Sequence, residues 1–158
     1  MAEGRVYTVD LAQTAVTAAV DLIELTPADD KPIEVLGFEI YQITDVGDTA
    51  EEIIGMEWIR GHTVSGSGGS TPTPRPVNPS DAAAGFTAET FNTTPANTGT
   101  TNILQNHGWN VRIPTPVVYT PEEYPKASQA NTTLILRFLN APGDSLTIGG
   151  HVKVRELG

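Results

Sequence analysis

Apolar residues recur at every second position through most of this 158-residue chain, whereas the three-to-four-residue spacing of an amphipathic helix is nearly absent. In the last segment Leu146, Ile148 and Val152 alternate with polar residues such as Thr147 and Lys153. A period of two is the pattern of a strand with one buried face. The sequence therefore predicts an all-β protein of about eight strands, at residues 5–10, 16–26, 33–44, 52–62, 85–91, 103–113, 132–139 and 146–155.

The connections between these strands indicate their arrangement. No helical segment separates any two of them, and parallel strands need such a crossover. We therefore expect an antiparallel β-sandwich that forms a single domain over residues 1–158. Eight strands with two long connections fit a jelly roll best. An immunoglobulin-like sandwich stays open, because many related sandwiches lack the cysteine pair that this chain also lacks.

Two of the predicted strands have irregular patterns. The apolar phase slips by one residue after Val35, beside Gly37, which predicts a bulge or a strand covered on both faces. Residues 48–62 combine Thr49 and Glu52, spaced like a helix capping box, with β-branched pairs. We favour a strand over residues 52–62, because Gly55 would cost a helix about 1 kcal/mol.

Residues 64–79, which we call the arm, differ in kind from the strands. Three glycines among serines come first, and four prolines among threonines follow. Such a segment is flexible in its first half and stiff in its second. We expect the arm to be an excursion from the domain that forms no regular ladder hydrogen bonds and is mobile in the free protein. Residues 114–125 also hold four prolines and are expected to be extended and mostly unpaired.

The charge of the chain is strongly asymmetric. Its net charge is −10, and residues 1–60 carry all of it, with 13 acidic and three basic side chains. This balance argues against nucleic-acid binding, which needs clustered Lys and Arg. The acids are expected to keep the protein soluble, or alternatively to face a basic partner. With no apolar run of 18 residues and no apolar leader, we expect neither a membrane span nor a secretion signal.

Motifs that carry chemistry are not apparent. The histidines His62, His107 and His151 lack the spacing of metal ligands, and cysteine is absent. A triad built on Ser65 and His107 would place its nucleophile in a flexible glycine-rich segment, where it could not be held rigidly. We therefore predict that the protein is not an enzyme and has no cofactor or metal. Trp58, Trp109 and the Tyr119/Tyr124 pair, taken together, are expected to be core or interface anchors, with a sugar-binding platform as the alternative.

Four segments together resemble a known group of proteins. They are residues 21–30, 33–40, the Gly/Pro-rich stretch 69–76 and the closing strand 146–158. Their overall pattern is similar to that of the small jelly-roll structural proteins of tailed-phage particles, in particular the capsid decoration (cement) proteins. The resemblance implies a homotrimer on the outside of the virion, made in the host cytoplasm and bound to the major capsid protein. Alternatives are a tail or fibre component and a carbohydrate-binding or adhesin module.

The segments expected to contact partners are the N-terminal residues up to Thr8, the arm, and residues 114–125. Within or beside them we predict five partner-binding residues, two of them arginines and three of them tyrosines: Arg5, Tyr7, Arg75, Tyr119 and Tyr124. The partners expected are other copies of the chain and the capsid protein, without nucleic acid or membrane.

Overall fold

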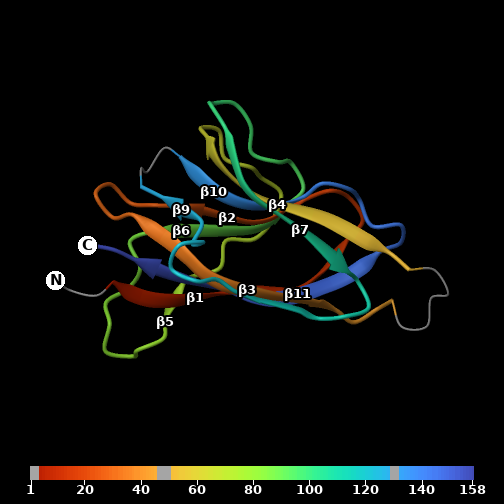
Figure 1. The fold of residues 1–158 in the computed structure, drawn as a ribbon, viewed down its shortest axis with the longest axis horizontal. Coiled ribbons are helices and arrows are strands. Elements are labelled where there is room, and N and C mark those ends of the chain that lie inside the picture. Colours follow the sequence, from red (N-terminus) through yellow and green to blue (C-terminus); the bar gives the residue numbers. More distant parts are fainter. Residues whose placement is uncertain (1–3, 46–50, 129–131) are drawn as a thin grey trace.

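The computed structural model describes residues 4–45, 51–128 and 132–158, and within these ranges it contains eleven strands and no helix (Figure 1). In chain order the strands are β1 (Arg5–Val16), β2 (Asp21–Thr26), β3 (Ile33–Gln42), β4 (Ile53–His62), β5 (Arg75–Pro76), β6 (Thr87–Asn92), β7 (Asn102–Asn110), β8 (Thr115–Val118), β9 (Lys126–Ala127), β10 (Thr133–Phe138) and β11 (Leu146–Glu156).

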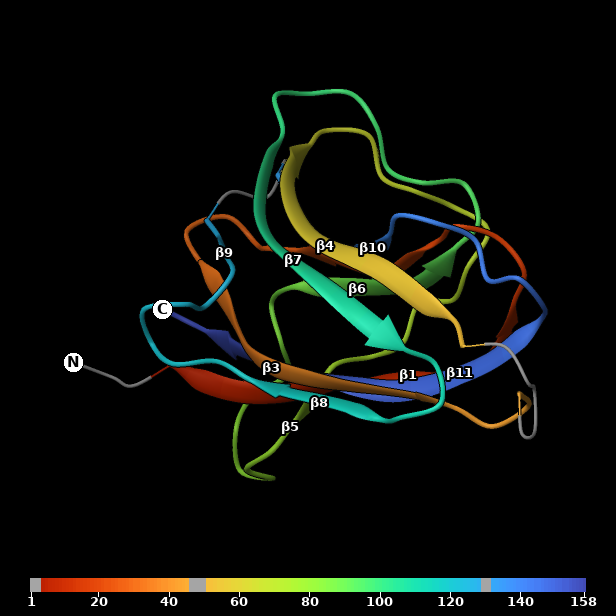
Figure 2. The same cartoon turned by 45° about the vertical axis from the view of Figure 1, so that its right-hand side comes forward.

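The strands form two antiparallel sheets that face each other as a sandwich (Figure 2). Sheet A has the order β5-β1-β11-β3-β8, and β9 also pairs with β3. Sheet B has the order β6-β2-β10-β4-β7. The first strand lies beside the last, with Arg5 opposite Glu156, so the start of β1 and the end of β11 lie at the same end of sheet A. The predicted all-β, antiparallel sandwich is confirmed.

The alternation in the sequence explains how each strand packs. In β1 the side chains of Tyr7, Val9 and Leu11 are buried, while Asp10 between them is exposed. The two inner faces meet in one core, where Trp58 of β4 and Trp109 of β7 are fully buried. Large aromatic rings, together with many aliphatic side chains, fill the space between the sheets.

The predicted number of strands is wrong, and the excess comes from short edge strands. The eight predicted segments correspond to β1, β2, β3, β4, β6, β7, β10 and β11. Of the others, β5 and β8 lie in Pro-rich stretches that we expected to be unpaired, and β9 follows directly after the second of these stretches. Residues 115–118 pair with β3, with Pro116 opposite Glu39, because an edge strand tolerates a residue that lacks an N–H on its free side. The predicted strand over residues 16–26 is also wrong, since β1 ends at Val16 and the chain crosses to sheet B before β2 begins.

The bulge predicted beside Gly37 is confirmed. Lys153 of β11 pairs with Gly37 and the next residue, Val154, pairs with Val35, so that Leu36 is the extra residue on β3. The strand predicted over residues 52–62 is likewise confirmed as β4. Thr49, part of the alternative helical pattern, lies outside the described residues, as do residues 1–3 of the expected N-terminal contact segment.

The arm does form hydrogen bonds of the ladder type, contrary to our expectation. Ser67 and Thr94 exchange both main-chain bonds, at 2.9 and 3.0 Å, and Ser70 exchanges two with Thr90. Farther on, Arg75 pairs with Thr8 of β1. The arm therefore passes from the edge of sheet B to the edge of sheet A. Such pairing is possible because its first half contains glycines and serines, which keep their N–H donors.

No helix in the described part of the chain is long and apolar enough to cross a membrane.

Candidate interaction surface

Two of the five predicted partner-binding residues point into the protein. The Tyr7 side chain is fully buried, packs edge-on against Phe86 and donates a hydrogen bond to the carbonyl of Ala82 at 3.0 Å. Tyr119 is buried as well, and its hydroxyl forms hydrogen bonds with Trp58 and His107. The sequence could not reveal this, because tyrosine is common both in protein cores and at interfaces, and the sequence around it does not distinguish the two.

The other three residues gather at one end of sheet A. Arg5 begins β1, Arg75 lies in β5, and Tyr124 precedes β9, which pairs with β3. Arg5 and Arg75 are exposed and Tyr124 is half-buried. Their role in partner binding stays a prediction, but the fold brings them to a common region although they are separated by up to 119 positions in sequence.

Strand register adds basic residues that sequence reasoning missed. Thr8 of β1 lies opposite Arg75 on one side and Lys153 of β11 on the other. Neighbouring strands are about 4.8 Å apart, so the two basic residues start about 10 Å from each other on the same face. Arg155 lies two residues after Lys153 on β11 and therefore on the same face. It is opposite Glu34 of β3, and on the other side of β3 Glu34 is opposite Lys126 of β9. We call Arg75, Lys126, Lys153 and Arg155 the basic end of sheet A.

Part of this basic end is held in place by internal contacts. Arg155 donates to Glu34 at 2.9 Å, and the Lys126 ammonium lies 3.4 Å from the other oxygen of that carboxylate. Both cations also contact the Tyr124 ring, whose centroid lies 5.8 Å from the Arg155 guanidinium carbon and 5.9 Å from the Lys126 nitrogen. Cation–π contacts at this distance orient both side chains. Arg75 and Lys153, by contrast, are exposed and form no ion pair with any residue of the described ranges.

The charge on the outer face of sheet A changes sign along the strands. Two residues before Lys153 on β11, His151 lies opposite Asp10 of β1 and Glu39 of β3. A face with a basic end and an acidic row can bind a partner of matching polarity in one orientation, because the reversed orientation brings like charges together.

Several of the acids that dominate the first 60 residues lie inside the protein rather than on its surface. Asp21, Glu24 and Glu34 are buried and bind groups of the protein itself. Asp21 accepts the N–H of Ala96 at 2.7 Å, and Glu24 accepts the N–H of Gly66 at 2.9 Å. These carboxylates hold the irregular chain between β4 and β7 against sheet B, which is a structural use of acidic residues that composition alone does not reveal.

A hydrogen-bonded chain of aromatic residues lies in the core behind β8. Trp58 and His107 both contact the hydroxyl of Tyr119, at 2.8 and 2.9 Å. Desolvation by burial is the main cause that raises the pKa of the Tyr119 hydroxyl well above its ordinary value of 10, whereas burial lowers the pKa of His107 below 6.5. Both residues are therefore neutral at pH 7. Since Ser65 instead contacts Glu89, the structure does not assemble the Ser65–His107 pair into a triad.

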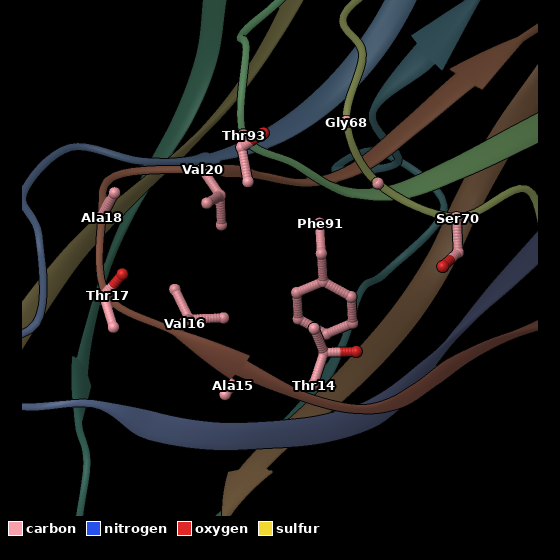
Figure 3. A pocket seen from close by; sticks show the side chains of 11 residues that line it. Thr14, Ala15, Val16, Thr17, Ala18, Val20, Gly68, Ser70, Phe91 and Thr93 are labelled. Carbon is pink, nitrogen blue, oxygen red and sulfur yellow. The ribbon is translucent and has the colours of Figure 1, made fainter.

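A small pocket lies where the β1–β2 connection meets the arm (Figure 3). Its volume is about 180 Å³, and Figure 3 shows the Phe91 ring beside Thr14, with Val16 and Val20 near it. Ligand pockets usually measure about 300–1,000 Å³. This one holds no charged side chain to orient a ligand, so we assign it no function.

The tryptophans and His62, which the sequence offered as candidate site residues, lie inside the protein. Trp58 and Trp109 are fully buried, so neither ring offers a platform for a sugar. Within the described ranges no three His, Cys, Asp or Glu side chains gather in a way that could hold a metal ion. His62 is buried and contacts Arg137 and the carbonyl of Thr98.

No family model matches the sequence, and no match was found among curated proteins or solved structures.

Proposed function

We propose that this protein is a virion structural protein of a tailed phage, a homotrimeric decoration protein that binds the outer surface of the capsid shell and stabilises the head. The single observation that carries the proposal furthest is the basic end of sheet A, on a chain whose net charge is −10. It is an exposed, rigid and charged surface built on paired strands, which suits binding through surface fit rather than through a pocket.

The strand pairing supports a jelly roll in particular. Four antiparallel pairs join strands of the first half of the chain to strands of the second half in nested order: β1 with β11, β2 with β10, β3 with β8, and β4 with β7. A jelly roll is a chain folded back on itself in this way and then rolled into two sheets. An immunoglobulin-like sandwich, the alternative, places its strands in the order ABED and CFG, in which the first and last strands lie in different sheets.

Charge complementarity indicates what the basic end would bind. Arg75 and Lys153 are exposed and unpaired among the described residues, so an acidic surface on the shell would gain from contact with them without breaking an internal ion pair. Repetition of the contact on three linked copies and over many shell sites would give avidity even where each contact is weak.

The proposal is tested with two measurements. Light scattering of the purified protein at micromolar concentration should give the mass of a trimer. Co-sedimentation with undecorated heads of the phage that encodes the chain should show binding that weakens as salt rises. The double variant Arg75→Glu, Lys153→Glu should reduce this binding at least about tenfold.

A matched control separates the basic end from net charge. Arg112→Glu makes the same change of charge as either single variant, Arg75→Glu or Lys153→Glu, at an exposed position outside the basic end, and it should bind like the unmodified protein. A strict monomer, or heads that do not bind the protein at low salt, would contradict the proposed function.

A further inference from the structure

β7 is an open edge of sheet B without the features that usually protect such an edge. Sheet B ends at β7 on one side, and sheet A ends at β5 on one side and at β8 and β9 on the other (Figure 2). Prolines lie in or beside these three strands of sheet A, at positions 74, 76, 114, 116 and 125, and the arm pairs beside β6. The nine residues of β7 include neither a proline nor a Lys, Arg, Asp or Glu. Such a bare edge can pair with another chain.

The register of β7 shows which of its main-chain groups are free. The N–H of Val111 binds the carbonyl of Glu52, and bonds of this kind recur at every second residue of an antiparallel ladder. Residues 105, 107 and 109 therefore bind β4, and the N–H and C=O groups of Asn106 and Gly108 point the other way. Within the described ranges β7 pairs only with β4, and no main-chain bond from outside the strands reaches these two residues. Both are exposed, and for Gly108 this means an exposed main chain.

Two facing glycines leave a gap between the side chains on the outer face of sheet B beside this edge. Gly55 and Gly108 are directly opposite each other in the β4–β7 register. A Cβ on Gly108 would lie 3.6 Å from Cγ2 of Ile53, and a Cβ on Gly55 would lie 3.3 Å from Cδ1 of Leu139. The Ile53 and Leu139 side chains, which border the gap, are 64% and 51% exposed. A bulky apolar side chain over Gly108 would therefore cover apolar surface that is otherwise in contact with water.

Glu57 supplies a negative charge without a partner next to this gap. It lies two residues after Gly55 on β4, directly opposite Asn106, and is 8% exposed. Its carboxylate forms neither an ion pair nor a hydrogen bond with a residue of the described part of the chain. Arg137, which lies opposite Glu57 on the other side, binds Asp21 instead. A nearly buried carboxylate without a partner is costly, and a cation from outside would lower that cost.

We propose that β7 binds an extended segment of another polypeptide, which adds to sheet B with a large apolar residue opposite Gly108 and a Lys or Arg opposite Asn106. Only an extended polypeptide offers a donor and an acceptor at every second residue, as the edge does. In antiparallel pairing the two anchor residues are two positions apart and lie on the outer face. The basic residue would start about 10 Å from Glu57, a span that its long side chain and that of Glu57 cover together.

The occupant is a different polypeptide rather than a second copy paired through its own β7. Since β7 contains no Lys or Arg, such a copy would offer Glu57 no cation. The inference is independent of the proposed function, because it concerns the edge of sheet B and needs neither a shell nor a trimer.

The probe is the capped hexapeptide Ac-Thr-Thr-Phe-Thr-Lys-Thr-NH2, titrated into ¹⁵N-labelled protein. We expect the amide signals of Asn106 and Gly108 to shift, hydrogen exchange at both amides to slow, and a dissociation constant on the order of 1 mM or tighter. Peptides with Glu in place of Lys, with Gly in place of Phe, or with a methylated Phe nitrogen should each bind at least about fivefold more weakly. Absence of these shifts, or equal binding of all four peptides, would overturn the proposal. Protection of the Gly108 amide that rises with protein concentration, without peptide, would assign the edge to a second copy and would overturn it as well.

Two protein variants test the two anchors separately. Glu57→Gln should remove the preference for the Lys peptide over the Glu peptide, while both amide signals still shift. Gly108→Val fills the gap, and the strand accommodates it because a Cβ there meets only Ile53, at 3.6 Å. This variant should bind the Phe peptide at least about fivefold more weakly. Asp29→Asn, at an exposed acid in the connection between β2 and β3, is the control and should bind as before. A preference retained by Glu57→Gln, or unchanged binding by Gly108→Val, would show that the proposed contacts are wrong.

Discussion

The indole N–H of Trp58 donates a hydrogen bond of 2.8 Å to the hydroxyl oxygen of Tyr119, and this bond crosses the core of the sandwich. Trp58 lies on β4 of sheet B, whereas Tyr119 follows directly after β8 of sheet A. The Tyr119 hydroxyl also forms a hydrogen bond of 2.9 Å with Nε2 of His107, in which the tautomer of the imidazole sets the donor. The three side chains therefore form one hydrogen-bonded chain that links the two sheets.

The Tyr119 hydroxyl should stabilise the fold measurably. Tyr119→Phe removes the acceptor of the Trp58 N–H, which is left unsatisfied in a buried site, and it also removes the hydrogen-bond partner of the half-buried His107 ring. We expect the free energy of unfolding in urea to fall by about 1–3 kcal/mol. The matched control is Tyr41→Phe, which loses only an exposed contact with Gln13 and should change stability by less than about 0.5 kcal/mol. Equal effects of the two variants would contradict this stabilising role of the Tyr119 hydroxyl.

Stability should fall as the pH drops from 8 to 5, in part because of His107. Burial lowers the pKa of His107 in the folded protein, while the unfolded chain titrates near 6.5. Between these two values the unfolded state binds more protons, so the stabilisation present above pH 6.5 is lost as the pH falls toward the lower folded pKa. Urea unfolding at several pH values should show a smaller decrease for His107→Gln than for the unmodified protein. A decrease of equal size would rule out this role.

At alkaline pH the advantage given by Tyr119 should shrink. The pKa of its hydroxyl is raised in the folded protein, mainly by burial, so the unfolded state loses its proton first as the pH rises past 10. The stabilisation is full below pH 10 and declines above it. The difference in unfolding free energy between the unmodified protein and Tyr119→Phe should therefore be smaller at pH 11 than at pH 8. A difference that grew with pH would have the wrong sign for this explanation.

The buried ion pair of Asp21 and Arg137 should be essential to the fold. Arg137 donates to both carboxylate oxygens and also to the carbonyl of Ala96 at 2.8 Å. Asp21→Ala leaves a largely buried guanidinium and the Ala96 N–H without their acceptor, which should cost about 3–5 kcal/mol. Thermal unfolding measures the loss, and Glu122→Ala, at an exposed acid, should have little effect. A loss below about 1 kcal/mol for Asp21→Ala would show that water replaces the pair.

Glu24 should hold the first half of the arm. Its carboxylate accepts the N–H of Gly66 at 2.9 Å, and Ser67 and Ser70 then pair with the chain around β6. Glu24→Ala should speed hydrogen exchange at Gly66, Ser67 and Ser70 at least about tenfold, with little change in β11, because local opening needs only the arm to detach. If exchange rose equally in β11, the variant would be unfolding the whole domain instead.

The basic end of sheet A could not be predicted from the sequence. Alternation places Lys153 and Arg155 on the polar face of the last strand, and composition marks Arg75 as an exposed charge in the arm. Nothing local relates position 75 to position 153, because strand neighbours follow from the order of strands in the sheet. The same holds for Tyr7 and Tyr119, which were expected at a surface and are buried.

The sequence by itself determined the class of the fold. The period of two, the turn residues and the bulge beside Gly37 depend on neighbours a few positions apart, and such signals can be read from the chain alone. Only the tertiary structure decided which strands became neighbours and which charges met: Asp21 and Arg137 are 116 positions apart and share two hydrogen bonds. The physical reason is that burial and long-range pairing are set by the sum of all strand contacts, so no single segment encodes them.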